Sequence, residues 1–330
     1  MILLVSCAML CGCQSPAVPP VKTVRVAYQP TTTNGPLYIA QDEGYFARQG
    51  INVEFVRTQS PVAALPLLVD GEVAVSTGPM KIGLLNAIIN GEHVRIVADK
   101  GKVTPGSCTA YALLVRQDLY DKGIVTRVSD LKDRKIAVRD SDYDLDKVLA
   151  LGNLTHDDVG AIDMEFTSIV PAFRNGAIDA ALAAEPYITL AGNSGAAVVL
   201  VPAQDFIPGW PFPLYYGPAI LDKDPELGRR FMVAYLQGVE QYSEGKTERN
   251  LRIMANYTNL DRDLLNQTCW YDIAPDGNLP PQSVREFADW MYDNKKISRS
   301  LRDDELLDMS YAAYASGILR NRTDRRNGAP

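Results

Sequence analysis

Short runs of β-branched and other apolar residues alternate along the chain with longer stretches whose apolar residues recur at helical spacing. The expected strands are residues 24–28, 51–56, 73–76, 94–98, 112–116, 135–139, 162–166, 178–182 and 214–221. The expected helices are residues 34–50, 61–70, 79–91, 141–151, 168–175, 225–242, 249–257, 281–292 and 303–315. This alternation predicts an α/β fold in which each lobe has a largely parallel sheet flanked by helices.

One arrangement of helix, strand and helix occurs twice. A helix ends at Asp70-Gly71, a strand follows, and Pro79 opens the next helix; later a helix ends at Asn175-Gly176, and Pro186 opens the next. Glycine just after a helix and proline in its first turn are common stop and start signals. The repeated arrangement predicts two similar lobes that face each other.

The length of 330 residues favours two cores over one, because single cores stop growing at about 250–300 residues. We expect the first lobe to comprise residues 22–112 and 214–330, and the second lobe residues 113–213. The chain then passes between the lobes near residues 111–115 and again near 214–219. Two such passages would form a hinge.

The first residues differ from the rest of the chain. Residues 1–10 are almost wholly apolar and lead into Leu10-Cys11-Gly12-Cys13, a run too short to span a bilayer. It is typical of an export signal whose end resembles a bacterial lipobox, so residues 1–13 are expected to be a signal with Cys13 as the lipidated residue. Residues 14–21, rich in proline, would be a tether. The alternative is a buried N-terminal strand or helix.

Composition removes several classes of function. Apolar residues make up 46% of the chain, and the net charge is −7 without clustered Lys or Arg, so nucleic acid is not an expected partner. With two histidines and no C-x-x-C motif, neither a metal site nor a cofactor is expected. Cys108 and Cys269 remain in the folded part; they could pair in an oxidising compartment, or each could be a small buried apolar residue.

Several short sequence motifs, referred to below as phrases, resemble those of a known family. They are residues 24–30, 35–40 and 43–54, then 70–78, then Asp130-Leu131-Lys132 leading into 135–138, and residues 176–180 with Glu185-Pro186-Tyr187. In this order the phrases resemble the solute-binding proteins of ABC importers for nitrate, sulfonates, taurine and thiamine precursors. The resemblance implies the type II periplasmic-binding fold with a ligand cleft between the lobes. It also implies separate permease and ATPase partners and a monomeric receptor at the outer face of the cytoplasmic membrane or in the periplasm.

Ligands of open α/β sheets bind beyond the carboxyl ends of the strands, where helices begin. This rule and the crossings give the expected ligand-binding residues: Gln29, Thr32, Thr33, Asn34, Thr77, Lys100, Arg139, Ser141, Asp142, Tyr143, Glu185, Trp210 and Tyr216. Helix capping is an alternative role for Asn34 or a neighbouring threonine. Trp210 is either a stacking wall for the ligand or a core aromatic residue at the hinge.

The charge of the expected cleft bears on the ligand. Asp140, Asp142, Asp144 and Glu185 open second-lobe helices, where carboxylates would repel a simple anion. A neutral or cationic heterocycle, such as a thiamine-pyrimidine precursor or a flavin, is therefore favoured over nitrate or a sulfonate. Anion binding, an enzyme of the same fold and a sensor remain alternatives. No nucleophile or acid–base motif is visible, so no catalytic activity is expected.

Overall fold

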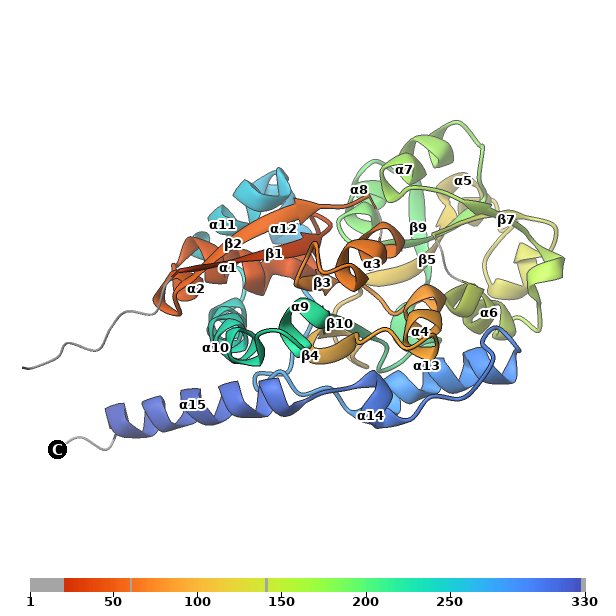
Figure 1. The fold of residues 1–330 in the computed structure, drawn as a ribbon. Coiled ribbons are helices and arrows are strands. Elements are labelled where there is room, and N and C mark those ends of the chain that lie inside the picture. Colours follow the sequence, from red (N-terminus) through yellow and green to blue (C-terminus); the bar gives the residue numbers. More distant parts are fainter. Residues whose placement is uncertain (1–20, 60, 140–141, 328–330) are drawn as a thin grey trace, which may run out of the picture.

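Two separate five-stranded sheets form the framework of the protein. The structure is a computed structural model, and it describes residues 21–59, 61–139 and 142–327. Sheet A has the strand order β2-β1-β3-β10-β4, and sheet B has the order β7-β6-β8-β5-β9. Figure 1 shows the two sheets in separate lobes with helices around each. The α/β fold with two lobes is confirmed.

Each sheet has one strand that runs against the other four. In sheet A this strand is β10, which pairs antiparallel with both β3 and β4. In sheet B it is β5, between β8 and β9. The strands of sheet A are β1 Lys22–Tyr28, β2 Ile51–Arg57, β3 Val75–Thr77, β4 Arg95–Lys102 and β10 Pro211–Tyr216. Those of sheet B are β5 Tyr111–Arg116, β6 Lys135–Val138, β7 Gly160–Asp163, β8 Ala180–Ala184 and β9 Ala197–Pro202.

The reversed strands directly follow the segments that connect the sheets. Residues 103–110 lead from β4 to β5, and residues 203–210 lead from β9 to β10. The expected crossings at 111–115 and 214–219 lie instead inside β5 and around the end of β10, where backbone hydrogen bonds hold much of the chain in a sheet. The expected strand over 214–221 ends at Tyr216, because Pro218 begins helix α9.

Helices of the first lobe cover both faces of sheet A. They are α1 Gly35–Asp42, α2 Tyr45–Arg48, α3 Pro61–Val69, α4 Ile82–Ile89, α9 Pro218–Leu221, α10 Pro225–Tyr242, α11 Glu248–Thr258, α12 Arg262–Gln267 and α15 Ser310–Asn327. The bounds of α10 match the expected helix, since Asp224 caps its first turn by accepting from the Leu227 amide. A Cβ on Gly238 would lie 2.1 Å from the Pro36 carbonyl oxygen, so glycine permits the close packing of α10 on α1.

The second lobe carries α5 Gln117–Asp121, α6 Asp142–Ala150, α7 Phe166–Arg174 and α8 Tyr187–Asn193. Two further helices, α13 Pro281–Asp293 and α14 Asp303–Leu306, come from the C-terminal part of the chain. Short 3₁₀ turns lie at 32–34, 128–131, 156–158 and 203–205. No helix of the described ranges is apolar over a length that would cross a bilayer.

The largest buried cluster is continuous between the lobes. It contains Leu68 of α3, Leu113 of β5, Leu145 of α6 and Phe287 of α13, together with Trp210 of the second connection. Since α13 contributes to this shared core, the C-terminal part of the chain packs against both lobes.

Candidate functional site

A cavity of about 330 Å³ lies where the two lobes meet. Its first-lobe walls come from α3, from the end of β3 and from the start of α4. Tyr143 of α6 supplies the second-lobe wall, and α13 supplies another. The lining residues are Val62, Leu65, Leu68, Ser76, Thr77, Pro79, Met80, Lys81, Ile82, Gly83, Leu84, Tyr143, Tyr215, Phe287, Met291 and Lys296. The position between lobes and the size are those of a small-molecule site.

Aliphatic, methionine and aromatic side chains make up most of this lining. Val62 and Ile82 are 48% and 37% exposed, so the cavity reaches solvent beside α3 and α4. The polar groups of the lining come from Ser76, Thr77, the two lysines and the hydroxyls of Tyr143 and Tyr215. The cavity therefore favours a ligand with an apolar or aromatic body over a small, strongly hydrated ion.

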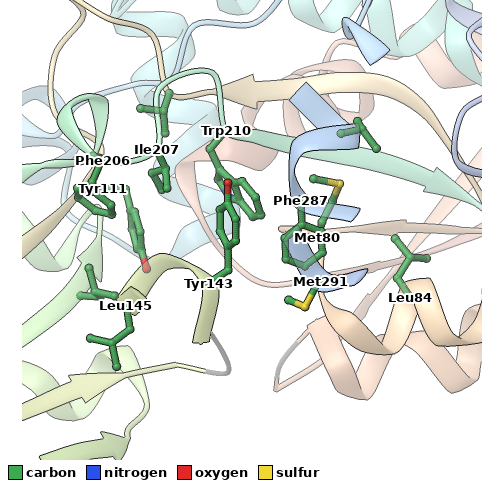
Figure 2. Close-up of a cluster of buried hydrophobic side chains, with 14 of the residues drawn as sticks. Met80, Leu84, Tyr111, Tyr143, Leu145, Phe206, Ile207, Trp210, Phe287 and Met291 are labelled. Carbon is green, nitrogen blue, oxygen red and sulfur yellow. The ribbon is translucent and has the colours of Figure 1, made fainter. Parts of the chain in front are cut away.

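Tyr143 connects the cavity to an aromatic cluster. Its ring stacks on Trp210 with a centroid distance of 4.7 Å, and its edge contacts Phe287 and Trp290 at 5.3 and 5.1 Å. Figure 2 shows Tyr143 beside Trp210, with Phe287 on the neighbouring helix. Of the two roles considered for Trp210, the structure favours the core role, since Trp210 is 5% exposed and does not line the cavity.

A second group of predicted residues gathers at the carboxyl ends of β1 and β4. The Lys100 ammonium donates to Thr33 Oγ1 at 2.7 Å, and the Thr31 and Thr33 hydroxyls are 2.9 Å apart. Thr32 Oγ1 and Asn34 Oδ1 are buried and have no hydrogen-bond partner among the described residues. We call Thr31, Thr32, Thr33, Asn34 and Lys100 the threonine–lysine cluster.

Burial changes the pKa of Lys100 in this cluster. Lys100 is 1% exposed, and desolvation lowers its pKa to about 7, although the neighbouring Asp99 opposes the shift. Both Asp99 carboxylate oxygens accept from backbone amides, those of Gly101 and Ala274, each at 2.8 Å. Lys100 is thus a buried amine that donates a hydrogen bond to a hydroxyl.

Gln29 and Thr77 have local partners. Gln29 Nε2 donates to Thr58 Oγ1 at 2.6 Å, and the Gln29 carbonyl accepts from Asn34 Nδ2 at 2.7 Å. Asn34 therefore holds the loop after β1. The Thr77 hydroxyl donates to the Ala27 carbonyl at 3.4 Å, while Thr77 also lines the cavity.

Arg139 bridges the lobes at the edge of the cleft. Its Nη2 donates to the Gln59 carbonyl of the first lobe at 2.9 Å, and its Nη1 pairs with Glu165 of the second lobe. Lys81 of the first lobe donates to the Arg139 carbonyl at 3.3 Å. The expected ligand residue Arg139 thus has partners in both lobes.

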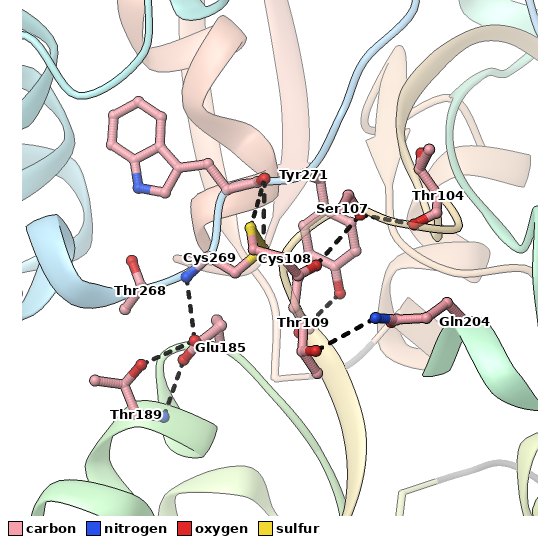
Figure 3. Close-up of a disulfide and its surroundings, with 12 residues drawn as sticks. Thr104, Ser107, Cys108, Thr109, Glu185, Thr189, Gln204, Thr268, Cys269 and Tyr271 are labelled. Carbon is pink, nitrogen blue, oxygen red and sulfur yellow. Dashed lines mark hydrogen bonds between the residues drawn. A yellow bond between two sulfur atoms is a disulfide. The ribbon is translucent and has the colours of Figure 1, made fainter. Parts of the chain in front are cut away.

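Glu185 also joins the lobes. Its Oε1 accepts from the Cys269 amide at 3.1 Å and from Thr189 Oγ1 at 2.8 Å, while Oε2 accepts from the Thr189 amide at 3.1 Å. Figure 3 shows this carboxylate below the disulfide that joins Cys108 to Cys269. The disulfide, one of the two alternatives left open by the sequence, links the first connection to the segment after α12. Burial raises the pKa of Glu185.

The expected ligand residue Tyr216 does not face the cleft. It is fully buried in the core of the first lobe, where its hydroxyl donates to the Gly228 carbonyl at 2.9 Å. Side chains alternate along a strand, so its neighbour Tyr215 points the other way and lines the cavity. The prediction of Tyr216 as a cleft residue was wrong by one position.

Some predicted positions cannot be placed. Cys13 and Ser141 lie outside the described residues. Asp142 begins α6, but the structure does not describe its side chain.

Other cavity residues were missed by sequence reasoning. Met80, Phe287 and Met291 lie at helix positions that the sequence marks only as apolar. A buried core helix would show the same pattern as α13, so no signal in the pattern distinguishes a cavity wall from core.

Two lobes of matching strand order, joined by two connections and enclosing a cavity, define an α/β protein of the type II periplasmic-binding class. The family model described as NMT1/THI5 like matches residues 31–245, and the chain belongs to this family. A Brucella abortus (strain 2308) protein, named only provisionally as a binding protein, is 31% identical over 141 residues. That match covers 41% of this chain and 44% of the relative, so the chain is aligned with less than half of that protein.

Solved structures share the fold at low sequence identity. The alkanesulfonate-binding protein SsuA of Xanthomonas axonopodis pv. citri, bound to MOPS, is 19% identical with a TM-score of 0.71, over 88% of this chain and 99% of that one. The periplasmic nitrate-binding protein NrtA of Synechocystis PCC 6803 is 17% identical with a TM-score of 0.71, over 92% and 91% of the two chains. The desulfurization enzyme DszB is 14% identical with a TM-score of 0.68, over 91% and 99%. The fold therefore occurs in both binding proteins and an enzyme.

Proposed function

We propose that this protein is the extracytoplasmic solute-binding component of an ABC importer and that it captures a small organic molecule between its lobes. The observation that best supports this function is the cavity, whose walls come from the first lobe, from Tyr143 of the second lobe and from α13. A ligand in this cavity would contact both lobes only when they are closed, so binding would shift a hinge equilibrium toward the closed form. The two connections, residues 103–110 and 203–210, would serve as the hinge.

The walls support an organic ligand over a small inorganic ion. A nitrate ion would be far smaller than about 330 Å³ and would lose its hydration against apolar side chains. An aromatic or heterocyclic body would bury its surface against Leu65, Met80 and Tyr143 instead.

The charges favour a neutral ligand over a cationic one. Lys81 and Lys296 line the cavity, and no Asp or Glu does so among the described residues. Glu185, on which the expectation of an acidic cleft partly rested, is occupied by Thr189 and the Cys269 amide. A neutral heterocycle with hydrogen-bond acceptors, such as a pyrimidine or a flavin, suits these surroundings.

An anionic ligand is the second candidate, and the threonine–lysine cluster supports it. Lys100 donates to Thr33 at the strand ends, and the buried Thr32 hydroxyl, which has no hydrogen-bond partner among the described residues, could donate to an anion. A sulfonate could take hydrogen bonds from Lys100 and the threonine hydroxyls. The two candidates place the polar group of the ligand differently.

Cys13 would carry a lipid that anchors a monomeric protein to the outer face of the membrane, and residues 14–21 would be the tether. A permease would recognise the closed form, and separate ATPase subunits would supply energy. The chain itself would catalyse no reaction. Because DszB shares the fold, incubation with each hit and analysis for product tests this last point.

The experiment is a thermal-shift screen of residues 14–330 followed by calorimetry of each hit. The panel holds hydroxymethylpyrimidine, riboflavin, MOPS, taurine and nitrate. A ligand at 100 times its Kd adds about 2.7 kcal/mol of stability, which raises Tm visibly. A heterocycle hit supports the first candidate, a hit confined to sulfonates or nitrate supports the second, and no hit from an extended solute panel contradicts solute binding.

Closure is tested separately. Arg139→Ala removes the bond to the Gln59 carbonyl, so small-angle scattering should give a larger radius of gyration and calorimetry a weaker affinity. Arg174→Ala is the matched control, because Arg174 is an exposed arginine of the same lobe. Equal behaviour of the two variants would contradict closure through Arg139.

A further inference from the structure

Helix α13 forms a wall of the cavity, although it lies beyond residues 31–245, the part of the chain that the family model matches. All of the strands except β1 lie within the matched part. The cavity is completed by Phe287 and Met291 of α13 and by Lys296 just after the helix.

Two cavity residues of α13 lie on one face of the helix. Phe287 and Met291 are four residues apart, which places them one turn apart on the same side. They are 2% and 6% exposed, and Met80 of the first lobe, 1% exposed, also lines the cavity. Figure 2 shows Met80 together with Phe287 and Met291 beside α13.

These side chains differ in how firmly they are held. Phe287 is fixed by edge contacts with Tyr143 and Trp210, at centroid distances of 5.3 and 5.1 Å. Met291 has an unbranched side chain with three rotatable bonds, which adapts to differently shaped neighbours. Met291 is thus the adjustable part of the wall, and Phe287 is the rigid part.

We propose that α13 is the selectivity wall of the cavity, and that Met291, opposed by Met80, limits the length of the apolar group that a ligand places there. The ligand class is an aromatic or heterocyclic molecule with a short apolar substituent directed at α13. This inference rests on the proposed function, because it assumes that the cavity is the ligand site.

The experiment is calorimetric titration of residues 14–330 with 4-n-alkylbenzamides, from the methyl to the octyl compound. These probes have an aromatic body, a neutral amide and a chain of graded length. Each methylene that the cavity buries should tighten Kd by about fourfold. The gain should stop at the chain length at which the alkyl group reaches Met291.

Variants of Met291 should move that limit in both directions. Met291→Ala removes three non-hydrogen atoms, so the gain should continue for about two further methylene groups. Met291→Trp should shorten the limit, and Met291→Leu should keep it. Met309→Ala is the matched control, since Met309 is a partly buried methionine that packs on the same core and does not line the cavity.

The outcomes separate the two proposals. An unchanged length limit in folded Met291→Ala and Met291→Trp, or an equal shift in Met309→Ala, overturns the role of Met291. Failure of every benzamide to bind the wild type also overturns it. If solutes of the earlier panel still bind in that case, the proposed function stands; if neither set binds, both proposals fail. Circular dichroism and Tm establish that each variant is folded.

Discussion

The carboxylate of Glu185, at the end of β8 in the second lobe, accepts a hydrogen bond at 3.1 Å from the backbone amide of Cys269, in the segment that follows α12 of the first lobe. The same carboxylate takes two bonds from Thr189 at the start of α8. One buried side chain therefore both holds a helix start and joins the lobes.

Glu185→Ala should destabilise the protein. The substitution leaves the Thr189 and Cys269 amides without their acceptor in a buried place, at a cost of about 1–3 kcal/mol. Urea unfolding followed by circular dichroism measures the loss. Glu165→Ala is the control, because Glu165 is a largely exposed carboxylate of the same lobe. An equal, small loss in both variants would contradict the structural role of Glu185.

The pKa of Glu185 predicts a pH dependence. Burial raises this pKa in the folded state, so the native protein holds the proton more tightly than the unfolded chain. The stability that Glu185 contributes is therefore largest at low pH and falls as the pH rises from the ordinary glutamate value toward the raised one. Glu185→Gln does not titrate. Its free energy of unfolding relative to wild type should improve between pH 4 and pH 7, and a constant difference would contradict this sign.

Lys100 predicts the opposite direction at higher pH. Burial lowers its pKa to about 7, below the ordinary lysine value of about 10.4, so the unfolded chain binds the proton more strongly. The stability of the wild type should therefore rise between about pH 7 and pH 10. Lys100→Met should lack this rise, and urea unfolding at each pH measures it. If the free energy of unfolding changes equally with pH in both proteins, Lys100 is not responsible.

The Cys108–Cys269 disulfide should contribute strongly to stability. It closes a loop with a sequence separation of 161, and removing a bond of this kind typically costs about 2–5 kcal/mol. The double variant Cys108→Ser/Cys269→Ser tests this in residues 14–330, which contain no other cysteine. Reductant should lower the urea midpoint of the wild type and leave that of the double variant unchanged. A response in both would mean that reductant acts elsewhere.

Sequence reasoning reached the fold because local signals and the global pattern agree. Pro225 and the periodic apolar residues after it mark α10, whose bounds match the expected helix. The predicted threonines and Lys100 do gather, because parallel strands bring their carboxyl ends to one edge. The expected crossings fall instead within β5 and around the end of β10, because a reversed strand such as β5 looks the same in sequence whether it joins two sheets or belongs to one of them.

The cavity could not be predicted from the pattern of apolar and polar residues. One wall of the cavity comes from α13, a helix far from the strand ends in sequence. Tertiary packing brings Met291 of this helix to the same cavity as Met80. The sequence also does not show that the Glu185 carboxylate accepts hydrogen bonds from within the protein. Backbone pattern predicts which elements form, whereas the partners of a buried polar group depend on tertiary contacts.

Tyr215 and Tyr216 offer a matched pair that tests which face of β10 serves the site. Each hydroxyl donates to a backbone carbonyl, that of Gly78 at 3.2 Å for Tyr215 and that of Gly228 at 2.9 Å for Tyr216. Loss of either bond should lower the free energy of unfolding by about 1 kcal/mol. Only Tyr215 lines the cavity, next to the turn at Gly78 that precedes α4.

Tyr215→Phe should therefore weaken the Kd of a ligand identified by the thermal-shift screen several-fold, because the turn beside the cavity loses its tie to β10. Tyr216→Phe should leave that Kd unchanged, because its ring lies in the core behind the sheet. Calorimetry and urea unfolding of both variants separate binding from stability. A loss of affinity in Tyr216→Phe alone would place the ligand on the opposite face of sheet A, and the cavity between the lobes would then not be the binding site.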